Sequence, residues 1–308
     1  MFLGSTHRCL VPKDKGLQFV VLQRLEKPIF FVHRLLVKFG ISFGRKMLLC
    51  RVNLAFEFIK YQLEAKGRYR IHSPFVYEFA SKVLLTQCLP SHIASINGYR
   101  TSLKNNTQQI AFQDFGAGSK RLGKNRSIQE IYLQSATSKK NGRLLYAISK
   151  HYQPKNILEF GTSLGVGTLS MHLGNSKAKI DTVEANKDIC EFAKNNINGF
   201  SENKENIHFY HATFDDFIET HLAKKYDLIF IDGHHDGRAM LHYLSKLRPF
   251  IHNQTVIVLD DIRWSDSMLD AWKECIKQTE FHVTLDLFSF GLLIPRSEQE
   301  KQHFVIRY

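Results

Sequence analysis

The stretch that decides the fold is Asn156-Ile157-Leu158-Glu159-Phe160-Gly161-Thr162-Ser163-Leu164-Gly165-Val166-Gly167-Thr168-Leu169. It predicts a buried strand, then a turn that contains glycines, then the start of a helix. Glycine lets the backbone adopt a positive φ and approach a ligand closely, and the first turn of a helix offers N–H groups that lack an acceptor. Because α/β proteins hold nucleotide-like cofactors at such turns, we expect a cofactor site here.

The spacing of the glycines indicates which kind of cofactor to expect. A dinucleotide site needs G-x-G-x-x-G, with the pyrophosphate at the helix N-terminus. This turn has Gly161, Gly165 and Gly167 instead, and Glu159 stands two residues before the first of them. A carboxylate repels a pyrophosphate but pairs well with an ammonium or sulfonium group. Glu159 therefore favours a cofactor with a cationic amino-acid head.

A second acidic residue follows at the end of the next predicted strand, 179–184. Glu184 lies 23 positions after Gly161, where Rossmann-like folds place the carboxylate that accepts hydrogen bonds from the ribose hydroxyls. We expect Glu184 to bind ribose. The alternative is an ordinary βαβ turn with a glutamate on its surface.

The pattern E-x-G-x-x-x-G-x-G resembles motif I of the class I S-adenosylmethionine-dependent methyltransferases, whose glycine turn surrounds the methionyl part of the cofactor. The resemblance implies a Rossmann-like α/β fold with a seven-stranded, mostly parallel, doubly wound sheet, and S-adenosylmethionine as the cofactor. The residues that it implies for cofactor binding are Glu159, Gly161, Thr162, Ser163, Gly165, Gly167, Glu184, Thr213 and Asp232.

The C-terminal part of the chain, residues 141–308, alternates regularly between strand and helix patterns. Such alternation predicts a parallel sheet covered by helices on both faces. The segments 291–294 and 304–307 have no helix between them, so one of their strands is expected to run antiparallel. The predicted strands are 156–160, 179–184, 206–211, 226–232, 254–260 and 281–287, and the predicted helices are 165–174, 187–198, 214–223, 237–247 and 266–278.

Residues 47–140 are expected to form a helical cap with a loop or lid region over the cofactor edge of the sheet. Ser73 and Pro74 are typical of a helix start, at the N-cap and at the first helical position. From about Gln87 to Asn125 we expect a loop region. Its glycine cluster, 114–119, is followed by basic residues instead of an apolar helix face, which favours a mobile lid or a solvated linker.

Composition limits the possible functions. A chain of 308 residues that is 44% hydrophobic can bury an ordinary core without a disulfide or a metal. Its five cysteines are scattered and form no C-x-x-C pair, so we expect reduced thiols in a cytoplasmic protein. The net charge of +13 is uneven, because residues 1–46 contribute nine Lys or Arg against two acids. The remainder is mildly basic and lacks an RNA-binding signature, which makes a nucleic-acid partner the weaker expectation.

The first 46 residues contain apolar runs that are too short to span a membrane and lack the pattern of a signal peptide. A clean amphipathic helix is predicted from Met47 onward. We therefore expect residues 1–46 to be a basic extension that folding and cofactor binding do not need. The alternative is a basic helix that binds a membrane surface or a partner protein.

Acids and histidines gather after two predicted strands, 226–232 and 254–260. The first strand ends in Asp232, with His234 and His235 just beyond it, and the second is followed by Asp260 and Asp261. Ligands in open α/β sheets collect at the carboxyl ends of the strands. Three carboxylates that converge repel one another unless they are protonated or bridged by a cation, and oxygen ligands of this kind suit Mg²⁺ or Ca²⁺.

The segments I-D-G-x-H and D-D resemble the metal-dependent O-methyltransferases. That likeness implies that Asp232, Asp260 and Asp261 hold a divalent cation, and that His234 or His235 is the base, of which we favour His235. The chain departs from the catechol-type enzymes, which carry Asp-Asn and often a lysine. In a metal-free alternative, Asp232 contacts the methionyl amine, and Asp260 and Asp261 cap the following helix. From about Met47 onward the chain also resembles an uncharacterised bacterial group of class I methyltransferases.

These expectations lead to one main hypothesis, methyl transfer from S-adenosylmethionine to a hydroxyl of a small molecule. A first alternative is methylation of a macromolecule, RNA or protein, guided by the basic extension. A second is a cofactor-binding module without turnover. The motifs typical of amino-group methyltransferases of nucleic acids, Asn-Pro-Pro-Tyr or Asp-Pro-Pro-Tyr, do not occur in the sequence.

Overall fold

The computed structural model describes residues 45–112, 124–201 and 203–308. The chain divides into two compact units, Met1–Phe56 and Glu57–Tyr308, and helix α2 (Arg45–Glu64) runs from the first into the second. The fold and the site described below belong to the second unit. Apart from its last two residues, the predicted extension lies outside the described residues, as does the glycine cluster at 114–119.

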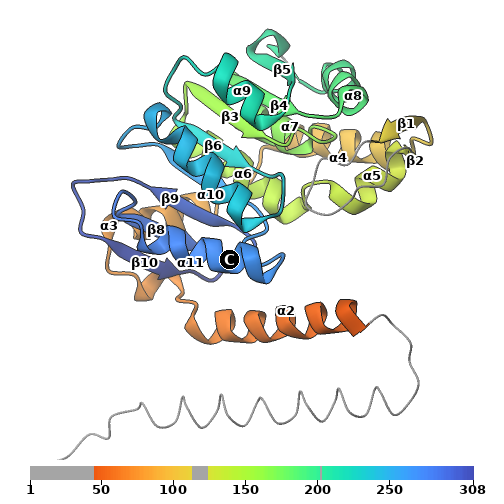
Figure 1. Ribbon diagram of the computed structural model, residues 1–308. Helices are drawn as coiled ribbons and strands as arrows, with labels where there is room; N and C mark the ends of the chain where they lie inside the picture. Colours follow the sequence, from red (N-terminus) through yellow and green to blue (C-terminus); the bar gives the residue numbers. More distant parts are fainter. Residues whose placement is uncertain (1–44, 113–123, 202) are drawn as a thin grey trace, which may run out of the picture. The chain divides into compact units, whose positions relative to one another are not determined.

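An eight-stranded sheet forms the centre of this unit (Figure 1). The strands lie in the order β10-β8-β9-β7-β6-β3-β4-β5, and β9 runs antiparallel to both of its neighbours while the other pairs are parallel. The prediction of a mostly parallel sheet with one antiparallel strand is confirmed. The sheet has one strand more than the seven that the resemblance implies, and its edge strand β10, beside β8, overlaps the predicted segment 304–307. The bounds are β3 (Asn156–Phe160), β4 (Lys179–Glu184), β5 (Ile207–His211), β6 (Leu228–Ile231), β7 (Val256–Leu259), β8 (Val283–Asp286), β9 (Gly291–Ile294) and β10 (Gln302–Val305).

Helices cover both faces of the sheet, with α6 and α7 on one face and α10 and α11 on the other (Figure 1). Each predicted helix after the glycine turn is present, with ends that differ from the prediction by at most a few residues. The helices of this part are α5 (Ile128–Ser135), α6 (Lys139–Tyr152), α7 (Val166–Gly174), α8 (Lys187–Ile197), α9 (Phe214–Thr220), α10 (Gly237–Leu247) and α11 (Asp266–Lys277).

The pleat of β3 decides where its glutamate points. Ile157 belongs to the hydrophobic cluster that includes residues of α6 and α7, whereas Leu158 and Phe160 belong to the cluster that includes residues of α10 and α11. Successive side chains of a strand point to opposite faces. Glu159 therefore points to the face covered by α7, the helix that follows the glycine turn.

One part of the chain differs from the prediction. The region from about Gln87 to Asn125, expected to be loop, contains helix α4 (Pro90–Lys104) and a hairpin of β1 (Gln109–Phe112) and β2 (Lys124–Ser127). The buried residues of α4 are Tyr99, Arg100 and Leu103, so the apolar period that marks a helix in a sequence is missing there. The helix start at Ser73 is confirmed, because α3 (Pro74–Glu78) begins with Ser73 Oγ accepting a hydrogen bond from Val76 N at 3.5 Å.

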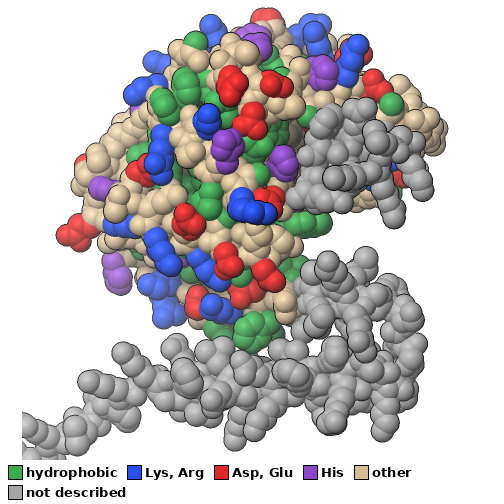
Figure 2. All heavy atoms as spheres, viewed as in Figure 1, with side chains coloured by type: hydrophobic (Ala, Val, Ile, Leu, Met, Phe, Trp, Pro, Cys, Tyr) green, Lys and Arg blue, Asp and Glu red, His purple; other side chains and the backbone are tan. Residues whose placement is uncertain are grey.

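The distribution of charged side chains on the surface indicates which kinds of partner the protein could bind. On the face shown in Figure 2, Lys and Arg side chains are interspersed with Asp, Glu and His instead of forming one continuous basic field. In the part of the chain that the structure describes, no helix combines the length and the apolar character needed to cross a membrane.

Candidate active site

The glycine turn after β3 packs directly against the end of β6. Gly161 has φ +98°, and a Cβ at this position would lie 1.9 Å from the carbonyl oxygen of Asp232. Gly165 has φ +75°, and a Cβ there would lie 2.3 Å from Cδ1 of Ile197. Side chains at either position would meet both a strained backbone and a collision. Glycine is therefore needed to bring this turn beside Asp232.

Glu159 is buried beneath the turn, with only 1% of its surface exposed. One carboxylate oxygen, Oε2, accepts hydrogen bonds from the hydroxyls of Thr168 and Thr182, the second at 2.6 Å. The other oxygen, Oε1, has no hydrogen-bond partner among the described residues, and a Cβ on Gly167 would lie 2.7 Å from it. Burial raises the pKa of Glu159 to about 7, although the two threonine hydroxyls act to lower it. A buried acceptor without a partner fits the expected binding of a cationic amino-acid head.

Glu184 lies beside the same turn, at the end of β4. Its Oε2 accepts a hydrogen bond from Ser163 N at 3.0 Å and its Oε1 accepts one from Asn186 N at 2.9 Å. Ser163 has a positive φ of 46°. Burial raises the pKa of Glu184, while the backbone N–H donors act to lower it. Because a carboxylate can accept about four hydrogen bonds, both oxygens keep capacity for ribose hydroxyls.

The two predicted threonines differ in position. Thr162 is buried, and its hydroxyl lies 2.6 Å from that of Thr182, which connects it to Glu159. Thr213 caps helix α9, because its Oγ1 accepts a hydrogen bond from Asp216 N at 3.2 Å and lies 2.7 Å from Asp216 Oδ2. The structure therefore brings Thr162 into the glycine-turn network and uses the Thr213 hydroxyl for a helix cap.

Helix α4 supplies two contacts that the sequence did not reveal. The Tyr99 hydroxyl donates to the carbonyl of Leu164, inside the glycine turn, at 2.6 Å. The neighbouring Arg100 donates from Nη2 to the carbonyl of Thr137, in the connection between α5 and α6, also at 2.6 Å. Burial of these polar side chains depends on contacts far along the chain, so no local pattern could have identified them.

The ends of β6 and β7 form an acidic edge, which we define as Asp232, Asp260 and Asp261. Burial, followed by the negative charge of Asp261, raises the pKa of Asp232 well above its ordinary range. Burial and the charges of Asp232 and Asp261 do the same for Asp260. Burial also raises the pKa of Asp261, while the nearby His235 acts to lower it. The three carboxylates are therefore close enough to influence one another electrostatically, as the sequence predicts.

This acidic edge is not arranged as a ready metal site. Within the described ranges, no three His, Cys, Asp or Glu side chains are grouped so that they could hold a metal ion. Asp260 Oδ1 instead accepts hydrogen bonds from Asp261 N at 2.7 Å and from Asn141 Nδ2 at 3.4 Å. The alternative in which Asp260 and Asp261 cap the next helix is wrong, because the N-cap of α11 is Ser265, which accepts from Met268 N at 3.2 Å.

The two adjacent histidines point to different partners. His235 Nδ1 lies 3.9 Å from Asp261 Oδ2, and the ring centroid of His235 lies 5.3 Å from that of Trp264, whose side chain is 64% exposed. His234 has φ +64°, and its Nδ1 lies 2.9 Å from the hydroxyl of Tyr243 on α10. The structure therefore places His235 at the acidic edge and turns His234 toward α10.

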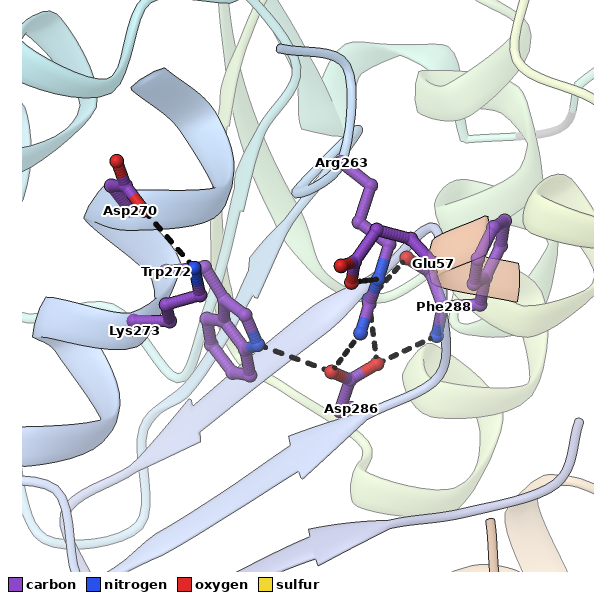
Figure 3. Close-up of polar contacts among 7 residues, drawn as sticks. All are labelled: Glu57, Arg263, Asp270, Trp272, Lys273, Asp286 and Phe288. Carbon is purple, nitrogen blue, oxygen red and sulfur yellow. Dashed lines mark hydrogen bonds and ion pairs between the residues drawn. The ribbon is translucent and has the colours of Figure 1, made fainter. Parts of the chain in front are cut away.

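A buried ion pair holds Arg263, which follows the acidic edge in the chain, against Asp286 (Figure 3). Arg263 donates to both carboxylate oxygens of Asp286, from Nη1 at 2.9 Å and from Nη2 at 2.7 Å, and its Nη1 also donates to the carbonyl of Phe288 at 2.8 Å. Asp286 further accepts from Trp272 Nε1 at 3.3 Å. A bidentate pair of this kind fixes orientation, so Arg263 restrains the loop that begins with Asp260 and Asp261.

Comparison with known proteins gave a match to a protein family and matches to solved structures of similar fold. Residues 158–262 match a protein family described as a methyltransferase domain. A crystal structure of a protein from Corynebacterium glutamicum is similar in fold, with a TM-score of 0.50, 13% sequence identity, and coverage of 72% of this chain and 97% of that one.

Two further solved structures are similar to a lesser degree. An O-methyltransferase from Bacillus cereus in complex with SAH has a TM-score of 0.46 and 15% identity, and the match covers 76% of this chain and 99% of that one. The O-methyltransferase TomG from Streptomyces achromogenes, in complex with SAM, has a TM-score of 0.47 and 14% identity, with coverage of 74% and 99%. Residues 158–262 therefore form a methyltransferase domain, which supports an S-adenosylmethionine-dependent methyltransferase.

Proposed function

We propose that this enzyme methylates a hydroxyl group of a small molecule, at the acidic edge. The observation that carries the proposal is the position of His235, between Asp261 and the exposed Trp264, at the end of β6. The backbone of Asp232, at the same strand end, touches the glycine turn. A methyl acceptor beside His235 would therefore lie next to the glycine turn, where we expect the cofactor to bind.

The residues present suit removal of a proton from a hydroxyl. The bound cofactor supplies a methyl group on a positively charged sulfur. His235 takes the hydroxyl proton while the acceptor oxygen forms a bond to the methyl carbon and the carbon–sulfur bond breaks, which leaves a neutral thioether. Asp261, whose Oδ2 lies 3.9 Å from His235 Nδ1, stabilises the protonated imidazole by its charge. Trp264 offers a flat apolar surface on which the acceptor can lie. Most of the rate enhancement comes from alignment of the reacting groups.

The test compares the two histidines. We expect His235→Asn to lower turnover by about 10²- to 10⁴-fold, the usual contribution of a general base, and to leave cofactor affinity unchanged. His234→Asn is the matched control, because His234 faces Tyr243. Equal losses in the two variants would contradict the role given to His235.

The substrate class is tested with methyl-labelled cofactor and cell extract. Label in a methyl ether of a small molecule would support the proposal. Label in RNA or in protein would contradict it, and binding of the cofactor without any labelled product would favour a module that does not turn over.

A divalent cation with Asp232, Asp260 and Asp261 as its ligands stays a separate proposal, because the described side chains do not form a metal-binding group. Its test is turnover before and after chelation. If the cation is needed, excess EDTA should abolish methyl transfer and added Mg²⁺ should restore it. Full activity in EDTA would leave proton removal to His235 alone.

A further inference from the structure

Arg100 is a buried cation whose charge has no partner in the site as described so far. Arg100 is only 6% exposed. Its Nη2 donates to the carbonyl of Thr137, but its Nε is buried without a hydrogen-bond partner among the described residues. Across those residues, no carboxylate forms an ion pair with it. A buried charge that lacks an ion partner is costly, so a bound anion would relieve this cost.

The position of Arg100 connects it to the cofactor turn. A Cβ on Gly142, in the first turn of α6, would lie 3.4 Å from Arg100 Nη2 and 3.1 Å from the hydroxyl of Ser170 on α7. One turn earlier on α7, a Cβ on Gly167 would lie 3.5 Å from the Thr137 hydroxyl and 2.7 Å from Glu159 Oε1. Arg100 therefore holds the carbonyl group of Thr137, and the hydroxyl of Thr137 lies near Gly167 of the glycine turn.

Two helix N-termini meet at the same place. Helix α6 begins after Ser138, whose Oγ accepts a hydrogen bond from Asn141 N at 3.1 Å, and α7 begins after Gly165. Helix N-termini favour anions through their free N–H groups and their dipole. The guanidinium of Arg100 adds a full positive charge beside the first turn of α6. Glu159 Oε1, which has no hydrogen-bond partner among the described residues, lies beside Gly167, the second residue of α7.

We propose that Arg100 is a positioning residue for the cofactor, which holds Thr137 and the start of α6 as a site for the α-carboxylate of the methionyl head. The ammonium group of the same head belongs on the Glu159 side. The zwitterion is thus recognised by opposite charges on the two walls of the turn. This role concerns cofactor binding only, so it can be tested without an acceptor and independently of the proposed O-methylation.

The experiment measures the affinity of two ligands by calorimetry. S-adenosylmethionine and its decarboxylated form share the sulfonium and ammonium groups and differ in the carboxylate. We expect the intact protein to bind the decarboxylated form at least about tenfold more weakly, which corresponds to about 1.4 kcal/mol. Equal affinities would overturn the proposal. This comparison needs no substitution and does not depend on whether a variant folds.

Substitution of Arg100 then identifies the source of the preference. Arg100→Met should weaken S-adenosylmethionine by about tenfold and leave the decarboxylated form within about twofold, because only the first ligand carries the anion. Arg100→Lys, which keeps the charge, should recover part of the affinity. The exposed Arg238 provides the control variant Arg238→Met, which should change neither affinity. Equal weakening of both ligands by Arg100→Met would show a purely structural role and overturn the assignment.

Discussion

The glycine turn and the acidic edge lie against each other, yet they are built in opposite ways. The glycine turn is held by neutral hydroxyls and by backbone groups, such as the Tyr99 hydroxyl on Leu164 and the Ser163 N–H on Glu184. The acidic edge has carboxylates that raise one another's pKa, a left-handed Asp261 with φ +50°, and a buried ion pair of the residue that follows it in the chain. The difference teaches that hydrogen bonds fix the glycine turn, whereas at the acidic edge neighbouring carboxylates disfavour ionisation of Asp232 and Asp260, an effect that a proton or a cation relieves.

The largest effect is expected from breaking the ion pair of Arg263 with Asp286. Arg263→Met leaves Asp286 buried without its partner, and we expect unfolding free energy to fall by about 3 to 5 kcal/mol. Urea denaturation measures this loss. Arg248→Met is the matched control, because its pair with Glu280 is half exposed and should be worth less than about 1 kcal/mol. We expect the folded Arg263→Met variant to keep its cofactor affinity, and a loss of affinity would show that this ion pair also supports the glycine turn.

A second prediction concerns the pH dependence of the cofactor half. Because burial raises the pKa of Glu159 from 4.5 to about 7, the folded state binds more protons than the unfolded state between these values. Without cofactor, this glutamate therefore makes stability fall as pH rises through that window, by about 3 kcal/mol in total.

Glu159→Gln should remove this contribution, so that the difference in unfolding free energy between pH 5 and pH 8 becomes smaller. Denaturation curves of both proteins at the two pH values provide the measurement. Glu191→Gln, at an exposed surface pair, controls for the loss of one acidic group. Parallel pH profiles for the intact protein and Glu159→Gln would contradict the prediction.

The smallest effect is expected at the exposed tryptophan of the acceptor half. Trp264→Ala should change unfolding free energy by less than about 0.5 kcal/mol, because an exposed side chain contributes little packing. The chain offers its own control in Trp272, which is 1% exposed and whose replacement by alanine should cost about 3 to 5 kcal/mol. A large loss of thermal stability in Trp264→Ala would show that this residue supports the fold instead of the acceptor.

The sequence predicts the sheet well because short strand segments, most of them apolar, alternate with amphipathic helices. β3, β4 and α10 have the same ends in the structure as in the prediction. The positions of Glu159 and Glu184 could be expected for a similar reason, since a short motif fixes both the turn and the strand ends beside it.

Other features depend on contacts between distant segments and could not be read locally. Helix α4 lacks an apolar period because it buries Tyr99 and Arg100, whose partners are Leu164 and Thr137. His234 and His235 are adjacent in the sequence, which could not show that only His234 has a positive φ and contacts Tyr243 on α10. The acidic edge was predicted as a group, but the detailed spacing of its oxygens depends on Asn141, far away in the chain.

The two contacts made by helix α4 limit how far the chain can be shortened from its N-terminus without loss of the site. A fragment that begins at residue 141 would keep every strand of the eight-stranded sheet, yet it would lack Tyr99, Arg100 and Thr137. The match to the methyltransferase family is shorter still, at residues 158–262. A minimal excised catalytic unit should therefore reach back at least to Pro90, the first residue of this helix, so that the contacts of Tyr99 with Leu164 and of Arg100 with Thr137 are kept.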